Sequence, residues 1–417
     1  MKNNIRFDLS DYLIHFFRDV DMNSGSYIHL PEYCGHNCNH HQIKIEARYL
    51  IRLAIRNHKI ISSWSYRNGV RTIYGKSPAV CFTEMPIAAY LDAGFQRLKN
   101  KEKIGLYALL FPKDKMFSVG ARPVIYALDS DLSVNDILSD GDERLIDETR
   151  LPLNEQYRYV SYYPQKVDWT HEREWRWPFR EATEEHKDNN YDNDFSRLPG
   201  LNFGALNISG AGVIVPFEND IPLISHDILT LIDRGDIKRG SFKFIIAIES
   251  LGSYKEIVDP KKLSDYINSN LLDFEKYFNL PVDTVEMYVN DIFSYIDELY
   301  RLKDFLNDEH SLEYGGVWIW VQDNQCEVVR ALVQAGKIIV NKEGHYLIDI
   351  NLNDKNWILR KKQSFANYVA KWLWNRYRLA ATSFAVGYSF DINGIPTYFR
   401  ELDKKHPFYN ETESPRV

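Results

Sequence analysis

Two hydrophobic periods divide the chain into predicted strands and helices. Short apolar runs bounded by prolines or polar residues predict strands in the first 250 residues. These runs cover 12–18, 78–86, 104–112, 120–126, 169–177, 211–216 and 242–248. Apolar residues spaced three to four positions apart predict amphipathic helices over 44–61 and 87–97. The hydrophilic run 181–197 predicts a loop.

The hydrophobic pattern changes after residue 252. Helical spacing continues through 253–307, with breaks at Pro260 and Pro281. The remainder predicts a small module with strands 315–321, 337–341, 346–350, 385–390 and 397–400, helices 326–336 and 356–377, and a hairpin turn at Asn393-Gly394. We therefore expect an α+β fold in three parts. They are a domain over 1–252, a helical connector over 253–310, and a small accessory or substrate-recognition α+β domain over 311–417.

Composition narrows the class of protein. The chain has 417 residues, 44% of them hydrophobic and 26% charged, which is typical of a soluble globular protein. No apolar run approaches the roughly 20 residues that span a bilayer, and four cysteines are too few for a disulfide scaffold. We expect a cytoplasmic protein with no membrane partner. The net charge of −7 restricts any contact with nucleic acid to a local basic surface.

A cluster of potential metal ligands follows the first predicted strand. Cys34, Cys38 and His40 are the candidates within an eight-residue segment that ends at His41. Thiolate and imidazole are the ligands that zinc favours, but the spacing matches no standard pairing. A polar loop without metal is the prediction, and a zinc site is the alternative.

The segment WTHEREWRW, residues 169–177, carries two carboxylates one residue apart. On a strand Glu172 and Glu174 would project from the same face. Such crowding raises the pKa of at least one carboxyl group, and perturbed carboxyl groups concentrate at functional sites. The alternative is a charged sheet edge whose carboxylates pair with Arg173 and Arg176.

Two further segments combine aromatic and basic residues. The loop 62–75 could clamp a phosphate through its arginines and stack a base on its aromatic rings, or it could be a solvated crossover. The predicted helix 356–377 with Trp372, Trp374 and Arg376 reads as a core helix with a basic outer face. Nucleic-acid contact is the second interpretation of that face.

Four segments together resemble the ADP-ribosyltransferase superfamily. They are the first strand with His15, the helix after it, the strand end at Thr83, and the segment with Glu172 and Glu174. More narrowly, PAVCFTEMP, GARPVIY and WTHEREWR resemble the AbiGi-type abortive phage-resistance proteins over roughly residues 8–250. The stretch from GGVWIWV to GHYLIDI resembles a separate uncharacterised bacterial domain, which implies no activity.

The resemblance implies an ADP-ribosyltransferase-like split β-sheet core with flanking helices and NAD as its substrate. In that superfamily a first-strand His or Arg holds the nicotinamide ribose or a phosphate, and a second-strand Ser, Thr or Tyr lines the nicotinamide pocket. A late Glu stabilises the oxocarbenium-like transition state. Carried onto this sequence, Glu174 would be that residue and Glu172 the base that activates the acceptor. The implied NAD-binding residues are His15, Thr83, Phe82, Tyr74 and Arg18.

These implications lead to a toxin or effector in bacterial anti-phage defence that transfers ADP-ribose to RNA, DNA or protein, with an antitoxin or chaperone as a further partner. The aromatic and basic residues from Trp64 to Tyr74 and from Trp372 to Arg378 favour nucleic acid as the acceptor. The second strand reads Cys-Phe-Thr-Glu instead of Ser-Thr-Ser, and no adenine-binding motif is evident. An inert sensor or antitoxin is therefore one alternative. An NAD glycohydrolase and a nuclease that binds metal through Glu84, Glu172, Glu174 and the histidines are the others.

Overall fold

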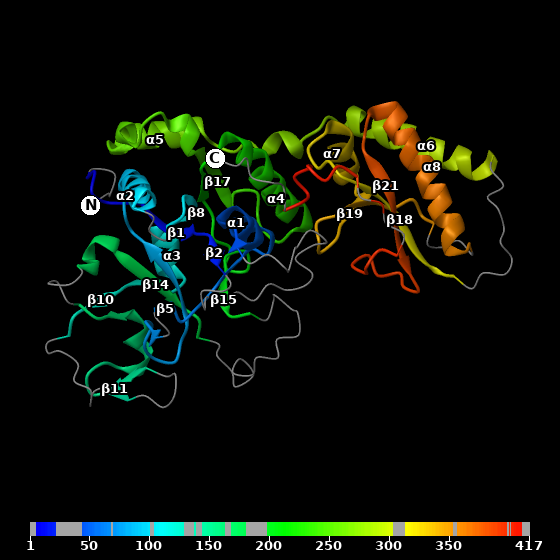
Figure 1. The fold of residues 1–417 in the computed structure, drawn as a ribbon. Coiled ribbons are helices and arrows are strands. Elements are labelled where there is room, and N and C mark those ends of the chain that lie inside the picture. Colours follow the sequence, from blue (N-terminus) through cyan, green and yellow to red (C-terminus); the bar gives the residue numbers. More distant parts are fainter. Residues whose placement is uncertain are drawn as a thin grey trace. The chain divides into compact units, whose positions relative to one another are not determined.

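The computed structural model describes residues 6–21, 44–67, 70–100, 104–128, 137–138, 144–162, 168–180, 198–302, 313–352, 357–397, 400 and 402–410. Contacts within the chain divide these residues into two compact units (Figure 1). Unit 1 holds the described residues up to Ile224 and those of Gly240–Leu272, and unit 2 holds Ser225–Arg239 and those from Asp273 onward. The first boundary thus falls inside helix α4 (Ile221–Arg234). The expected mixture of helices and strands is confirmed.

A seven-stranded mixed sheet forms the centre of unit 1. Its strands lie in the order β17-β16-β8-β1-β7-β14-β9. All neighbours pair antiparallel except β16 and β17. The bounds are β1 (Tyr12–Phe17), β7 (Ala79–Thr83), β8 (Tyr107–Pro112), β9 (Arg122–Pro123), β14 (Glu174–Pro178), β16 (Ala211–Val215) and β17 (Phe242–Ala247).

Helices cover both faces of this sheet. Helices α2 (Ile87–Lys99) and α5 (Pro260–Ser269) share one buried apolar cluster with Ile14 and Leu110, which lie opposite each other on β1 and β8. We call this the α2 face. Tyr107 points to the other face, where its hydroxyl donates to Asp220, the partner of Arg48. Because Arg48 belongs to α1 (Ala47–Arg56), the other face is the α1 face.

Shorter elements complete unit 1. The helix predicted over 44–61 ends at Arg56 because His58 adopts a positive φ of 41° and the chain turns into a strand. The predicted loop 62–75 contains a two-stranded hairpin. The remaining strands and α-helix are β2 (Val20–Asp21), β3 (Lys44–Ile45), β4 (Lys59–Ile61), β5 (Tyr66–Arg67), β6 (Val70–Arg71), α3 (Lys113–Ser118), β10 (Ile125–Tyr126), β11 (Ile137–Leu138), β12 (Leu145–Ile146), β13 (Tyr159–Val160) and β15 (Gly200–Asn202).

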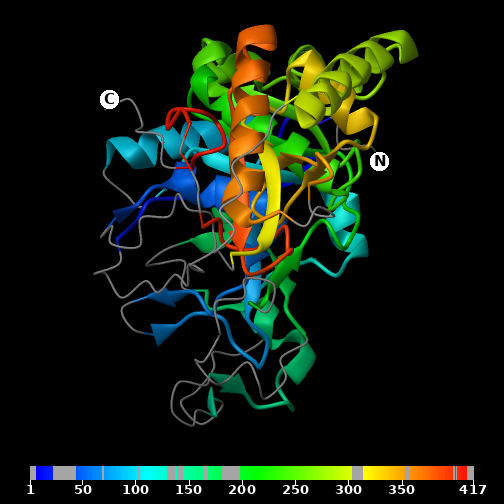
Figure 2. The same cartoon turned by 90° about the vertical axis from the view of Figure 1, so that its right-hand side faces the viewer.

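Unit 2 is built on a four-stranded antiparallel sheet in the order β19-β20-β18-β21. Figure 2 shows helix α8 lying along strands β18 and β21. One face of the sheet buries an aliphatic core with three helices, and the other buries an aromatic cluster that includes Trp320 and Phe384. The bounds are α6 (Val282–Leu302), β18 (Gly315–Val321), α7 (Glu327–Gln334), β19 (Ile338–Val340), β20 (Tyr346–Ile348), α8 (Leu359–Tyr377) and β21 (Ala381–Gly387).

The structure differs from two predictions for the second half of the chain. The residues 253–310, expected to form one connector, divide between the units, because α5 belongs to unit 1 and α6 packs in the core of unit 2. The strand predicted over 385–390 lies earlier, at Ala381–Gly387, because it pairs along the whole of β18. The turn does form, with the Gly394 amide donating to the Asp391 carbonyl oxygen. No helix in the described part of the chain is long and apolar enough to cross a membrane.

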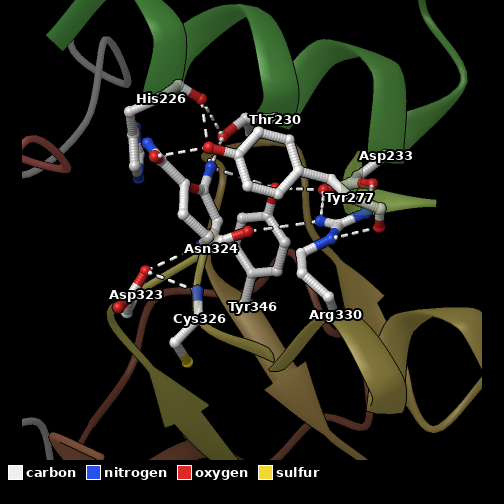
Figure 3. Close-up of polar contacts among 10 residues, drawn as sticks. His226, Thr230, Asp233, Tyr277, Asp323, Asn324, Cys326, Arg330 and Tyr346 are labelled. Carbon is white, nitrogen blue, oxygen red and sulfur yellow. Dashed lines mark hydrogen bonds and ion pairs between the residues drawn. The ribbon is translucent and has the colours of Figure 1, made fainter. Parts of the chain in front are cut away.

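A buried polar network ties α4 to the rest of unit 2 (Figure 3). The guanidinium of Arg330 donates to both carboxylate oxygens of Asp233, at 2.6 and 2.9 Å, and to the Tyr277 carbonyl oxygen at 2.9 Å. The Tyr346 hydroxyl donates to the same Asp233 carboxylate at 2.6 Å. Burial, and then the Asp233 charge, raises the pKa of Tyr346 well above its usual range. Each buried charge therefore has partners, as a low-dielectric interior requires.

Replacing Arg330 with Met tests this network. The substitution leaves the Asp233 carboxylate buried without its cation, so we expect unfolding free energy to fall by about 3–5 kcal/mol in urea titration. Arg239→Met is the matched control because Arg239 pairs with Glu275 at the surface, with side chains 48% and 64% exposed. That change should cost less than about 1 kcal/mol. Equal losses for both variants would contradict the assignment.

A glycine in the unit 1 sheet makes room for an aromatic ring. Gly212 lies opposite Phe244, and a Cβ atom at Gly212 would approach the Phe244 ring to 2.2 Å. Phe244 is fully buried, so its ring has little space to withdraw. We expect Gly212→Ala to destabilise the protein by about 1–3 kcal/mol. Gly240→Ala is the control, since a Cβ atom there would meet no atom of the described residues within 4 Å; its urea midpoint should match the wild type.

Candidate functional site

The pairing register of three strands decides which predicted residues meet. Thr83 lies opposite Ile14 on β1 and opposite Glu174 on β14. Directly opposed residues in a sheet point to the same face, and successive residues alternate. Glu174 and Thr83 therefore project to the α2 face together with Ile14. Arg176, which pairs with Cys81, shares that face.

The prediction of one strand through 169–177 is wrong for its first half. Trp169–Glu172 forms a 3₁₀ turn, which Asp168 caps by accepting from the Thr170 amide at 2.9 Å. Arg173 has a left-handed φ of 44°, and the strand begins only at Glu174. Glu172 thus does not follow the strand alternation with Glu174. The turn is held against β7 because the Thr83 hydroxyl donates to the Glu172 carbonyl oxygen at 2.6 Å.

An ion pair orients Glu174. The Arg176 guanidinium donates to its two carboxylate oxygens, at 2.7 and 3.3 Å. The third nitrogen of Arg176 donates to the carbonyl oxygens of Tyr157 and Tyr159, so the cation itself is fixed. Although burial opposes it, the Glu174 charge helps to hold the pKa of Arg176 above its usual value. The Arg176 side chain is 5% exposed and that of Glu174 is 23% exposed, so the pair is open on the carboxylate side.

Glu172 has a different pair of partners. Its carboxylate accepts from Arg97 of α2 at 3.1 Å and lies 3.4 Å from the His171 imidazole. The side chain is 20% exposed. Burial, together with the charges of Glu174 and Glu172, raises the pKa of Tyr126, whose hydroxyl donates to the Trp169 carbonyl oxygen. Two anchored and partly exposed carboxylates therefore lie within electrostatic range of one tyrosine.

His15 does not join this group. It follows Ile14 on β1, so alternation places it on the α1 face, opposite Thr83 and Glu174. Its ring packs edge-on against Phe17 and Phe82, with centroids at 4.9 and 5.7 Å. Its Nδ1 lies 2.9 Å from the Cys81 carbonyl oxygen. Burial lowers the pKa of His15 to about 4, which keeps the imidazole neutral at pH 7.

The other predicted NAD-binding residues are also dispersed. Phe82 is buried on the α1 face with His15, and Arg18 lies just past the end of β1. Tyr74 is buried in a separate small core, where its ring contacts Tyr159 and its hydroxyl accepts from Arg144. Thr83 lies on the same face as Glu174, but its hydroxyl donates to the Glu172 carbonyl oxygen and accepts from the Met85 amide.

The predicted metal ligands Cys34, Cys38 and His40 lie outside the described residues. Over the part of the chain that is described, no group of three or more His, Cys, Asp or Glu side chains could hold a metal ion. Burial, followed by the Glu174 charge, raises the pKa of the Cys81 thiol, so this cysteine is not a thiolate nucleophile near neutral pH.

Sequence reasoning did not identify two residues near the Glu172 and Glu174 carboxylates, Arg97 and Tyr126. Arg97 lies 75 positions before its partner Glu172, and no sequence spacing signals that contact. Tyr126 reaches the turn through a backbone carbonyl, which has no sequence signature. The charge pairing proposed as the alternative is present for Arg176, whereas Arg173 instead lies against Asp8. The Glu174–Arg176 pair was visible because the two residues are two positions apart on a strand.

The low pKa of His15 predicts an acid-dependent stability. The folded protein binds the His15 proton only near pH 4, whereas an unfolded chain binds it below about pH 6.5. Stability from the neutral imidazole is therefore complete above pH 6.5 and declines as the pH falls towards 4. We expect wild-type unfolding free energy to drop by about 3 kcal/mol more than that of His15→Gln between pH 7 and pH 4. Parallel pH dependences in urea titration would refute a buried neutral His15.

Comparison with known proteins finds one family model, which matches part of unit 2. Residues 280–411 match a family model described as a protein of unknown function (DUF4427). This match lies wholly within unit 2 and does not include Glu172 or Glu174 of unit 1. No curated protein matches the chain. No solved structure matches it either.

Proposed function

We propose that unit 1 is an NAD-dependent ADP-ribosyltransferase that transfers ADP-ribose to a macromolecule, with Glu174 and Glu172 as its catalytic carboxylates. The observation that carries the proposal is that both carboxylates are partly exposed and held in place by arginines. Each is about one-fifth exposed and each is held by an arginine, Arg176 or Arg97. Two fixed and accessible carboxylates, one in the turn before β14 and one at its first residue, suit a reaction that develops positive charge.

The reaction would proceed by cleavage of the bond between nicotinamide and ribose. The bonding electron pair leaves on the nicotinamide nitrogen, and positive charge develops on the ribose. The Glu174 carboxylate, oriented by Arg176, would stabilise that charge without having to reorganise. The acceptor nucleophile then bonds to the ribose carbon while Glu172 takes its proton as general base. Tyr126, protonated at neutral pH, lies close enough to interact with both charges.

His15 has a different role in this proposal from the one that the family resemblance implies. It lies on the face opposite Glu174 and is neutral, so it would stabilise the sheet instead of binding NAD. Arg97 is the better candidate for a phosphate of the substrate, because it is partly exposed and belongs to the same face. The resemblance to abortive phage-resistance proteins supports a cytoplasmic toxin in anti-phage defence, restrained by an antitoxin or chaperone.

A specific observation favours a second candidate, an inert binding module with the same fold. Thr83 is 3% exposed and its hydroxyl already bonds two backbone groups, so an NAD carboxamide would have to displace them. An NAD glycohydrolase, in which water replaces the acceptor, would use the same carboxylates. The transferase would release nicotinamide and attach ADP-ribose to a macromolecule. The glycohydrolase would release nicotinamide and free ADP-ribose, and the inert module would leave NAD intact.

The test is incubation of the full chain with adenine-labelled NAD and separate pools of protein, DNA and RNA. We expect label in one macromolecular pool, with nucleic acid favoured, because helix α8 exposes basic and aromatic side chains. Glu174→Gln should lower transfer by a factor of about 100 or more, since it removes the charge that opposes the transition state. Glu172→Gln should reduce transfer while sparing nicotinamide release.

Glu155→Gln is the matched control. Glu155 also pairs with an arginine, Arg158 at 2.6 Å, and its side chain is 33% exposed. Transfer by this variant should equal that of the wild type. Nicotinamide release without labelled macromolecule would identify a glycohydrolase. NAD left intact by the wild type in all pools would overturn catalysis and favour the binding module.

A further inference from the structure

Helix α8 of unit 2 turns one continuous stripe of side chains to solvent. Several exposed positions of the helix are three or four residues apart, so these share one side of it. Among them are Arg360, Ser364, Tyr368, Lys371 and Trp374; together with Arg378, the exposed left-handed residue that follows the helix, we call them the α8 stripe. The opposite side of the helix packs in the aliphatic core of unit 2. Figure 2 shows that the helix lies lengthwise on the sheet of unit 2.

The charge of α8 differs from that of the chain as a whole. The helix contains five lysine and arginine residues and no carboxylate, whereas the chain contains 51 basic and 58 acidic residues. Arg360 pairs with Glu313 at 3.1 Å, but its side chain is 63% exposed, so the pair is weak and open to exchange. Lys371 and Arg378 are exposed as well. The α8 stripe is therefore a local basic surface on an acidic protein.

Two aromatic rings alternate with these cations. Tyr368 is 45% exposed and Trp374 is 50% exposed. At the helical rise they are about 9 Å apart along the axis, with Lys371 midway. The guanidinium of Arg378 lies 5.9 Å from the centre of the Trp374 ring. Exposed rings offer a stacking surface to bases, and cations spaced between them can contact the phosphates that link those bases.

We infer that the α8 stripe binds single-stranded nucleic acid. Phosphates contact Arg360, Lys371 and Arg378, and bases stack on Tyr368 and Trp374. A membrane surface is the poorer partner, because an interfacial helix inserts an apolar side and the apolar side of α8 is already buried in the core. This binding involves unit 2 alone and requires no NAD.

The experiment is fluorescence anisotropy of the full chain with labelled oligouridine and oligodeoxythymidine over a range of salt concentrations. Trp374→Ala should weaken binding about tenfold, and Trp374→Phe should retain most of the affinity, because a base stacks on either ring. The double variant Lys371→Gln/Arg378→Gln should lower the slope of log affinity against log salt by about 1.4, since each phosphate contact on a single strand contributes about 0.7.

The double variant Lys261→Gln/Lys262→Gln is the matched control. Both lysines are exposed near the start of α5 in unit 1, so the charge change is the same and the site is different. Its affinity and salt slope should equal those of the wild type. The inference is overturned if the α8 variants bind like the wild type while folding normally by circular dichroism. It is also overturned if the wild type binds phosphatidylserine vesicles but no oligonucleotide at low salt. Because no variant touches Glu172 or Glu174, these outcomes are distinct from failure of the proposed transferase activity.

Discussion

The pairing register of β1, β7 and β14 is the constraint on which the candidate site depends. Two pairings decide it: Thr83 opposite Glu174 places these two on one face, and Ile14 opposite Thr83 places the next residue, His15, on the other. A shift of one residue would exchange every side chain between the two faces. Such a shift is opposed by the core, because Ile14 would leave the cluster that α2 and α5 bury. The packing of apolar residues thus decides which polar residues can act together.

Two arginine–carboxylate pairs show how burial separates a structural role from a chemical one. In unit 2, Asp233 and Arg330 are both almost fully buried and their hydrogen bonds are used within the core. In unit 1, Arg176 is equally enclosed, but its partner Glu174 retains about one-fifth of its exposure. The first pair contributes to holding α4 on the sheet of unit 2. The second leaves an oriented carboxylate oxygen partly open to solvent, as the proposed catalytic role would need.

The contact patterns also separate the two proposals. Catalysis would depend on a turn and a strand end in unit 1, where a hydrogen bond from Thr83 holds the 3₁₀ turn that carries Glu172. Nucleic-acid binding would depend on the outer side of one helix in unit 2 and on Arg378 at its end, opposite the helix side that the core buries. A helix can present such a surface without any loop geometry. For that reason the basic outer side was already visible in the sequence.

The sequence by itself determined the elements whose period is regular. The apolar spacing of α2 and α8, the buried runs of β7, β8 and β18, and the turn at Asn393-Gly394 all follow from local pattern and backbone preference. What only the tertiary structure decided is pairing. Glu172 lies outside the strand because Arg173 adopts a left-handed conformation. Arg97, which contacts Glu172, lies 75 positions away in the sequence. Strand neighbours and charge partners are set by which apolar faces bury together, and a linear pattern records the faces but not their partners.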